Sequence, residues 1–106
     1  MSKVFVPNKG AHDYSDAERF GELEYVTKGQ INSFAVGTMA RIWAESLKDS
    51  SPDDWIILTS LTTLCTIGCS QFAMKHRRLN LLLFRKDRYI ARKIFFDQLE
   101  EGADNE

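Results

Sequence analysis

Short apolar runs alternate with longer segments of helical periodicity along most of the chain. Residues 3–7 ("KVFVP") are β-branched and lead into "PNKG", which is typical of a strand. Residues 22–27 ("ELEYVT") alternate acidic and apolar positions, as a half-exposed strand does. Residues 55–59 and 79–84 are continuous apolar runs, which indicates strands covered on both faces. Residues 89–97 follow the polar turn "RKDR" and are expected to return as an antiparallel strand.

Three helices are expected between these strands. Ser15 followed three residues later by Glu18 has the spacing of a capping box and predicts a helix of one or two turns. Apolar residues at 3–4 spacing predict a second helix over about residues 34–47. A third helix over residues 61–76 is apolar almost all round and rich in small residues, and Ser60 is expected to cap it.

Strands that alternate with helices predict an α/β protein with right-handed crossovers. We expect a small three-layer sandwich around a mostly parallel, five-stranded mixed sheet with a C-terminal antiparallel hairpin. The 106 residues fit a single domain, taken as residues 1–97, and residues 98–106 form an acidic tail that is expected to be disordered. No apolar stretch approaches the ~18 residues of a membrane span and no signal-peptide pattern is seen, so a cytoplasmic location is expected, in the host if the protein is viral.

Ligands of open α/β sheets collect beyond the carboxyl ends of the strands, where two loops of this chain are expected to meet. The loop after the first strand holds a cation, an imidazole and a carboxylate, and the turn after the third holds hydroxyls. We expect Lys9 and His12 to lie near Ser60, and together the loops would suit a nucleotide or another phosphorylated small molecule. The turn lacks the glycine of a standard dinucleotide loop, so capping of the helix is the alternative for its hydroxyls. The candidate ligand-binding residues are Asn8, Lys9, Gly10, His12, Asp13, Ser60, Thr62 and Thr63.

Catalytic and metal chemistry have little support in the sequence. Cys65 and Cys69 stand four residues apart on one helix face, but a closed zinc site needs four ligands, so we expect two reduced cysteines and no metal. His12 with Asp13 is the single candidate acid–base pair, and adjacent residues seldom aim at one substrate. We therefore expect no catalytic residues and no cofactor, and favour a protein that is not an enzyme.

Charge is strongly segregated although the formal net charge is −1. Residues 75–93 contain eight basic side chains and one acid, Asp87, so this segment carries +7. Three interpretations remain open: a charged edge that prevents aggregation, a nucleic-acid surface with Tyr89 as a stacking partner, or a contact with acidic groups of a second copy. The last interpretation predicts an interface at Arg85, Lys86, Arg88, Arg92, Phe95 and Phe96.

The stretch "VFVPNKGAHDYSDAERFGELEYVTKG", with "SPDDWIILTS" further on, resembles small phage-encoded proteins of unknown function. This resemblance implies no activity and transfers no functional residues. The leading hypothesis is a non-enzymatic association module, either a homo-oligomer or a subunit of a larger, viral assembly. The alternatives are a nucleotide- or phosphate-binding protein or hydrolase that uses the first loop, and a nucleic-acid-binding protein that uses the basic hairpin. No membrane partner is expected.

Overall fold

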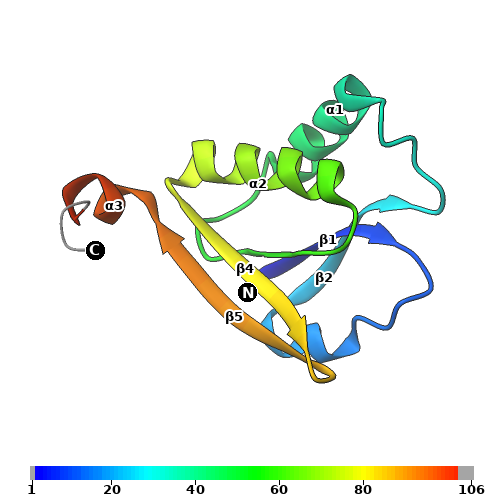
Figure 1. The fold of residues 1–106 in the computed structure, drawn as a ribbon, viewed down its shortest axis with the longest axis horizontal. Coiled ribbons are helices and arrows are strands. Elements are labelled where there is room, and N and C mark those ends of the chain that lie inside the picture. The colour runs from blue at the N-terminus through cyan, green and yellow to red at the C-terminus, as the bar shows by residue number, and fades with distance from the viewer. Residues whose placement is uncertain (1, 103–106) are drawn as a thin grey trace.

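The structure, a computed structural model, describes residues 2–102 (Figure 1). Within these residues, five strands form one sheet, and four helical segments accompany it. The strands are β1 (Lys3–Lys9), β2 (Glu22–Lys28), β3 (Trp55–Ile57), β4 (Arg78–Arg85) and β5 (Arg88–Phe95). The helical segments are the 3-10 helix η1 (Ser15–Phe20) and the α-helices α1 (Val36–Leu47), α2 (Thr62–His76) and α3 (Phe96–Gly102). No helix within residues 2–102 has the length and apolar character needed to cross a membrane.

The sheet has the strand order β2-β1-β3-β4-β5. The first four strands run parallel and β5 pairs antiparallel with β4, which confirms the predicted mixed sheet and its C-terminal hairpin. The chain moves from β1 outward to β2 and then crosses back to β3 on the other side of β1. Crossovers in opposite directions from β1 place η1 on one face of the sheet and α1 and α2 on the other (Figure 1).

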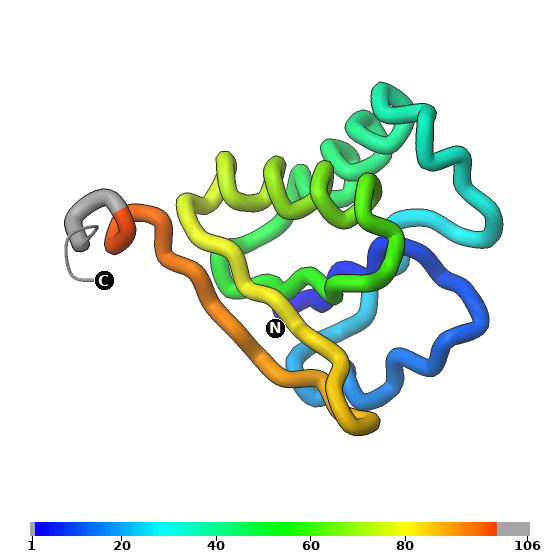
Figure 2. Tube along the Cα trace, viewed as in Figure 1, coloured from blue at the N-terminus to red at the C-terminus, as the bar shows by residue number. Residues whose placement is uncertain are grey.

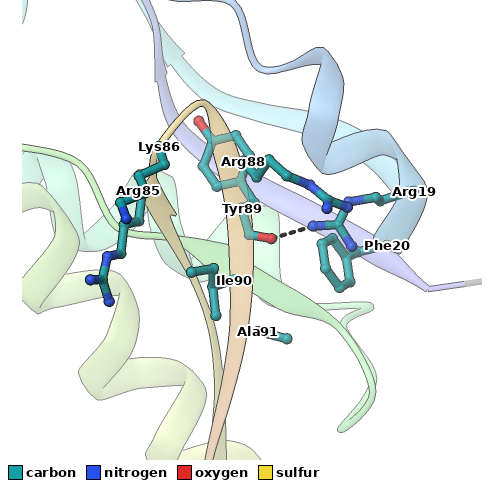
Figure 3. Close-up of a pocket in the computed structure, with 8 residues that line it drawn as sticks. All are labelled: Arg19, Phe20, Arg85, Lys86, Arg88, Tyr89, Ile90 and Ala91. Atoms are coloured by element: carbon teal, nitrogen blue, oxygen red, sulfur yellow. Dashed lines mark hydrogen bonds between the residues drawn. The ribbon is translucent and has the colours of Figure 1, made fainter.

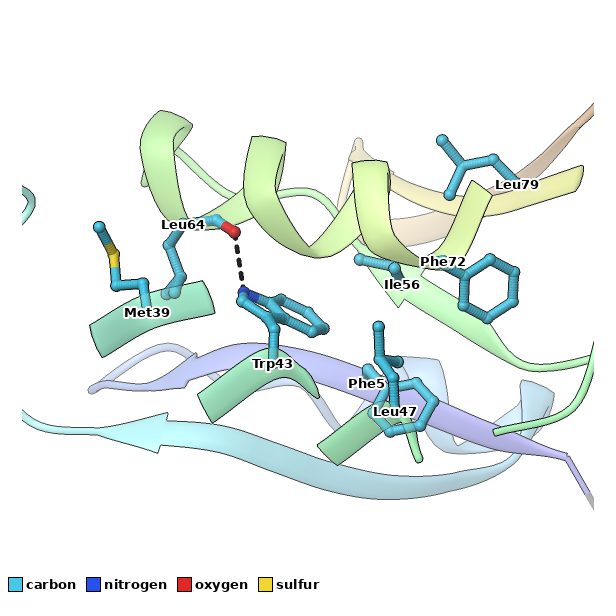
Figure 4. Close-up of a cluster of buried hydrophobic side chains, with 8 residues drawn as sticks. All are labelled: Phe5, Met39, Trp43, Leu47, Ile56, Leu64, Phe72 and Leu79. Carbon is cyan, nitrogen blue, oxygen red and sulfur yellow. Dashed lines mark hydrogen bonds between the residues drawn. The ribbon is translucent and has the colours of Figure 1, made fainter. Parts of the chain in front are cut away.

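The face under α1 and α2 holds one hydrophobic core, drawn in Figure 4. The indole of Trp43 lies between the two helices, fully buried, and its Nε1–H donates to the Leu64 carbonyl at 2.9 Å. The two helices approach closely at Gly68, where a Cβ would lie 2.3 Å from the Trp43 ring. Gly68, one of the small residues of α2, therefore allows α1 to pack close to α2.

The opposite face holds a second core, centred on η1. Tyr14 and Ala17 pack against Val4, Val6 and the hairpin residues Leu82 and Tyr89. Figure 2 shows the tip of the β4–β5 hairpin close to the segment that contains η1. The sheet therefore curls around η1, and this curvature brings residues far apart in sequence to one end of the molecule.

Local details differ from the sequence expectations because backbone groups find other partners. The helix expected at Ser15 is a 3-10 helix without a side-chain cap, and Asp13 Oδ1 instead accepts the Ser15 N–H at 2.9 Å. Ser60 does not cap α2. The N-cap is Leu61, whose N–H donates a hydrogen bond to the Thr59 hydroxyl oxygen at 3.2 Å.

The end of the chain also differs from the expectation. The last strand ends at Phe95 rather than at residue 97, and α3 follows it directly. Residues 98–102, assigned to the tail from the sequence, belong to this helix. Residues 103–106 lie outside the described part of the chain.

Candidate functional site

A pocket opens at the carboxyl ends of the parallel strands, beside the point where the strand order reverses between β1 and β3. Ligands of doubly wound sheets bind in the crevice at this position. We call it the switch-point pocket. Its volume is about 470 Å³, and it is lined by His12, Tyr14, Leu58, Thr59, Ser60, Leu83, Phe84 and Tyr89. The size is in the range of small-molecule sites, which is about 300–1,000 Å³.

Aromatic rings form one wall of the switch-point pocket. The His12 ring meets Tyr14 edge-on at 4.9 Å and Phe84 at 5.1 Å, and Phe84 lies 4.9 Å from Tyr89. Tyr89 is buried, and burial raises its pKa to about 12, so its hydroxyl stays protonated at neutral pH. Phe84 is 45% exposed. The pocket thus combines the accessible Phe84 ring, packed against His12 and Tyr89, with an imidazole and several hydroxyl groups.

Two of the eight predicted ligand-binding residues line this pocket. His12 comes from the loop after β1 and Ser60 from the turn after β3, so the structure brings together the two loops that the parallel strands place at one edge. Lys9 lies near the same end of β1, but its ammonium lies over the Tyr25 ring at 5.2 Å rather than in the pocket.

The remaining predicted residues serve the backbone or lie outside the pocket lining. Asn8 joins the ends of β1 and β2, since its Nδ2 donates to the Gly29 carbonyl at 2.9 Å. Asp13 is engaged by Ser15, and that backbone N–H lowers the pKa of the Asp13 carboxyl. The Thr62 hydroxyl donates to the Ser60 carbonyl at 3.4 Å. Gly10 and Thr63 are absent from the lining.

Reasoning from the sequence missed the aromatic wall. Tyr14 lies 70 or more residues before Phe84 and Tyr89 in the sequence, and only the curl of the sheet brings the hairpin to the first loop. Phe84 carried one readable signal, because it ends an apolar run immediately before a cationic turn. Thr59 also lines the pocket, although it is not among the predicted ligand-binding residues.

A second cavity of about 590 Å³ lies along the outer side of the hairpin (Figure 3). We call it the basic cleft, and its lining is Arg19, Phe20, Arg85, Lys86, Arg88, Tyr89, Ile90 and Ala91. The turn residues Lys86 and Asp87 both have left-handed backbone, with φ of 50° and 66°. Such a two-residue turn matches the twist of the strands and presents the neighbouring cations at a defined place.

Side chains of η1 hold the hairpin by its outer edge. Asp16 Oδ2 accepts the Tyr89 N–H at 2.7 Å, and Arg19 Nη2 donates to the Tyr89 carbonyl (Figure 3). Arg19 also pairs with Asp16 at 3.4 Å. The Tyr89 backbone N–H and then Arg19 lower the pKa of the Asp16 carboxyl. The two side chains take the place of a neighbouring strand and fix the hairpin tip against η1.

This tether is expected to be sensitive to acid. Because the folded-state pKa of Asp16 is depressed, its contribution is complete above the ordinary aspartate pKa of about 3.9 and is lost as the pH falls through the lower folded-state value. The Tyr89 amide signal in NMR spectra should therefore titrate with a midpoint below that ordinary value. Asp16→Ala should remove this titration and speed amide exchange at Tyr89 several-fold. Glu18→Ala, an exposed change in the same helix, should do neither.

The other predicted interface residues are engaged within the chain. Arg92 Nη1 donates to the Ala91 carbonyl at 2.7 Å. The Arg78 guanidinium covers the Phe95 ring at 4.6 Å, and Phe96 packs against the core under α1 and α2. The two phenylalanines are half-buried, so they do not form an exposed aromatic edge that would favour self-association.

The cysteines line a groove between α2 and β4. Both are free thiols, and burial raises the pKa of the Cys69 thiol to about 12, which disfavours the nucleophilic thiolate. Within residues 2–102, no three side chains of histidine, cysteine or acidic type gather as a metal site would require.

A protein-family model matches most of the chain. The model of the Phage Pam3 gp32-like protein family matches residues 2–96, which include every strand of the sheet. Comparisons with curated proteins and with solved structures find no match. The family has no assigned activity. The chain belongs to the Phage Pam3 gp32-like protein family.

Proposed function

We propose that the protein binds a phosphorylated ligand with a planar ring, such as a nucleotide, in the switch-point pocket. The observation that carries this proposal is the convergence of His12, Ser60 and Phe84 on one cavity at the carboxyl ends of β1, β3 and β4. The imidazole and hydroxyl groups can bond phosphate oxygens, and the accessible Phe84 ring offers a stacking surface.

Self-association, the leading hypothesis from the sequence, stays a prediction with less physical support. Besides the segregated charge, one ground for it is an edge strand that ends in the aromatic residues Phe95 and Phe96. In the structure, Arg78 covers Phe95 and Phe96 is partly buried. Side chains also occupy the outward backbone groups of Tyr89 and the Ala91 carbonyl. Such an edge is blunted against pairing with another strand.

Adenosine monophosphate is the first probe. In NMR titrations we expect it to shift the amide signals of His12, Thr59 and Ser60 with a dissociation constant below about 1 mM. Adenosine and inorganic phosphate should each bind more weakly, because each lacks one half of the recognised chemistry.

Matched phenylalanine variants test the stacking surface. Phe84→Leu should weaken binding about tenfold, since stacking of one base on an aromatic ring contributes about 1–3 kcal/mol. Phe34→Leu changes a ring that is 90% exposed but lies outside the pocket, and it should leave the affinity unchanged. Equal losses in both variants, or no amide shifts around the pocket, would contradict the proposal.

A further inference from the structure

The two cavities adjoin at the hairpin tip. Tyr89 lines both of them, and the consecutive residues Phe84 and Arg85 line one each. Neighbouring strand residues point to opposite faces of a sheet, and the consecutive residues 88–91 line the cleft, so the cleft runs along the edge of the hairpin and reaches both of its faces. Figure 3 shows Arg85 and Ile90 on one side of the hairpin and Arg19 and Phe20 on the other. A ligand that occupies both cavities would therefore pass over the tip of the hairpin.

The cleft side of this path is strongly cationic. It holds four basic residues, of which Arg19 pairs with Asp16. Among the described residues, no acidic side chain lies within ion-pair distance of Arg85, Lys86 or Arg88. Asp87 lies in the hairpin turn and Arg88 is close enough to Asp16 to lower the pKa of that carboxyl, but the four cations outnumber these two acids. An excess of cations around an open cavity favours a ligand with several negative charges.

The form of the hairpin favours a single strand over a duplex. A free two-stranded ribbon can enter the major groove of DNA. This ribbon is held by its edge, because Asp16 and Arg19 bond the Tyr89 backbone, and Phe84 rests against His12. An exposed phenylalanine ring can stack on an unpaired base, whereas the bases of a duplex already stack on one another.

We propose that this surface binds single-stranded nucleic acid. One base stacks on Phe84 in the switch-point pocket, and the adjoining phosphates cross the tip to Arg85, Lys86 and Arg88 in the basic cleft. This inference rests on the proposed function and names its ligand as a polymer rather than a free nucleotide.

The direct test uses the whole chain and a fluorescein-labelled oligodeoxythymidine of about twelve nucleotides, a length within the usual site sizes. Fluorescence anisotropy should report binding that weakens with salt, with a slope of about −2 to −3 if three or four phosphates are neutralised. Arg85→Glu with Arg88→Glu should lower the affinity more than tenfold. The matched control, Arg41→Glu with Lys48→Glu, changes the net charge equally at exposed positions on and just after α1, and it should leave the affinity unchanged.

Phe84 separates base stacking from charge. Phe84→Leu should weaken binding about tenfold with little change in the salt slope. Phe84→Trp should retain binding, which keeps the test valid if the leucine variant folds poorly. Circular dichroism melts of all variants report whether the fold is intact.

Several results would overturn the inference. If adenosine monophosphate shifts the pocket amides but the oligonucleotide binds no more tightly than the mononucleotide, the strand proposal is wrong and the nucleotide pocket stands. If neither ligand binds, both proposals fail. Tighter binding of a duplex of the same sequence, stronger competition by polyglutamate, or an equal loss in the α1 control variant would each replace the single strand with another explanation.

Discussion

Replacing Gly68 with alanine is expected to destabilise the protein by about 1–3 kcal/mol, the usual cost of forcing extra atoms into a packed core. The added Cβ would lie 2.3 Å from carbons of the Trp43 ring. The ring has little freedom to move away, because it is fully buried and its Nε1–H is bonded to the Leu64 carbonyl. Relief therefore requires α2 to shift away from α1. Urea unfolding followed by tryptophan fluorescence measures the loss.

Gly37 provides the matched control on the neighbouring helix. It is exposed in α1, and a Cβ there would meet only the Arg41 guanidinium, at 3.6 Å. Gly37→Ala should therefore stabilise the protein by less than about 0.5 kcal/mol, because Gly37 lies in the first turn of α1, where helix propensity matters less than in the interior. The same chemical change should thus have opposite signs on the two helices.

A double variant isolates the contact between the helices. Once Trp43→Leu has removed the indole, the further change Gly68→Ala should cost little, because the atoms that it would strike are gone. An equal cost with and without the indole would show that Gly68 is required for some other reason.

The helices and strands of this fold were predictable because their patterns of apolar residues have different periods. The apolar run at residues 55–59 and the run at residues 79–84 have no helical period, and the 3–4 spacing before Leu47 has no strand period. Helix starts were less predictable. Ser15 and Ser60 both have good capping chemistry, yet Asp13 and Thr59 bind the local N–H groups instead. Several hydroxyls and carboxylates compete at such turns, and sequence spacing does not decide among them.

The candidate site was predictable only where it depends on strand direction. Parallel strands deliver their following loops to one edge, which is why His12 and Ser60 could be placed together. The contribution of Phe84 depends on strand order and on the curl of the sheet around η1. These are properties of long-range packing, and an apolar residue before a turn does not reveal them. The basic residues of the hairpin were evident in the sequence, but the sequence did not show that they line a cleft.

The end of the sheet opposite the candidate site is held by buried polar groups. Asn80 is fully buried, and its Nδ2 donates to the Pro52 and Asp54 carbonyls, each at 2.7 Å. The buried Asp54 carboxylate accepts the Lys3 N–H and the Ser51 N–H, each at 2.8 Å. These bonds join the amino ends of β1, β3 and β4 to the turn before β3. The fold thus separates a structural end from the end that carries the two cavities.

Asn80→Leu is therefore expected to cost about 2–4 kcal/mol, because the Pro52 and Asp54 carbonyls lose their donor while an apolar side chain of similar shape excludes water. Asn32→Leu is the matched control: Asn32 is exposed, and its side-chain Oδ1 accepts a hydrogen bond from the Phe34 N–H, so its replacement should cost less than about 0.5 kcal/mol. Urea unfolding gives both values.

Asn80→Leu should also leave the nucleotide affinity of the folded protein unchanged, since the switch-point pocket lies at the other end of the strands. Wild-type stability in this variant would show that water reaches the two carbonyls, and reduced affinity in the folded variant would show that the two ends of the sheet are coupled.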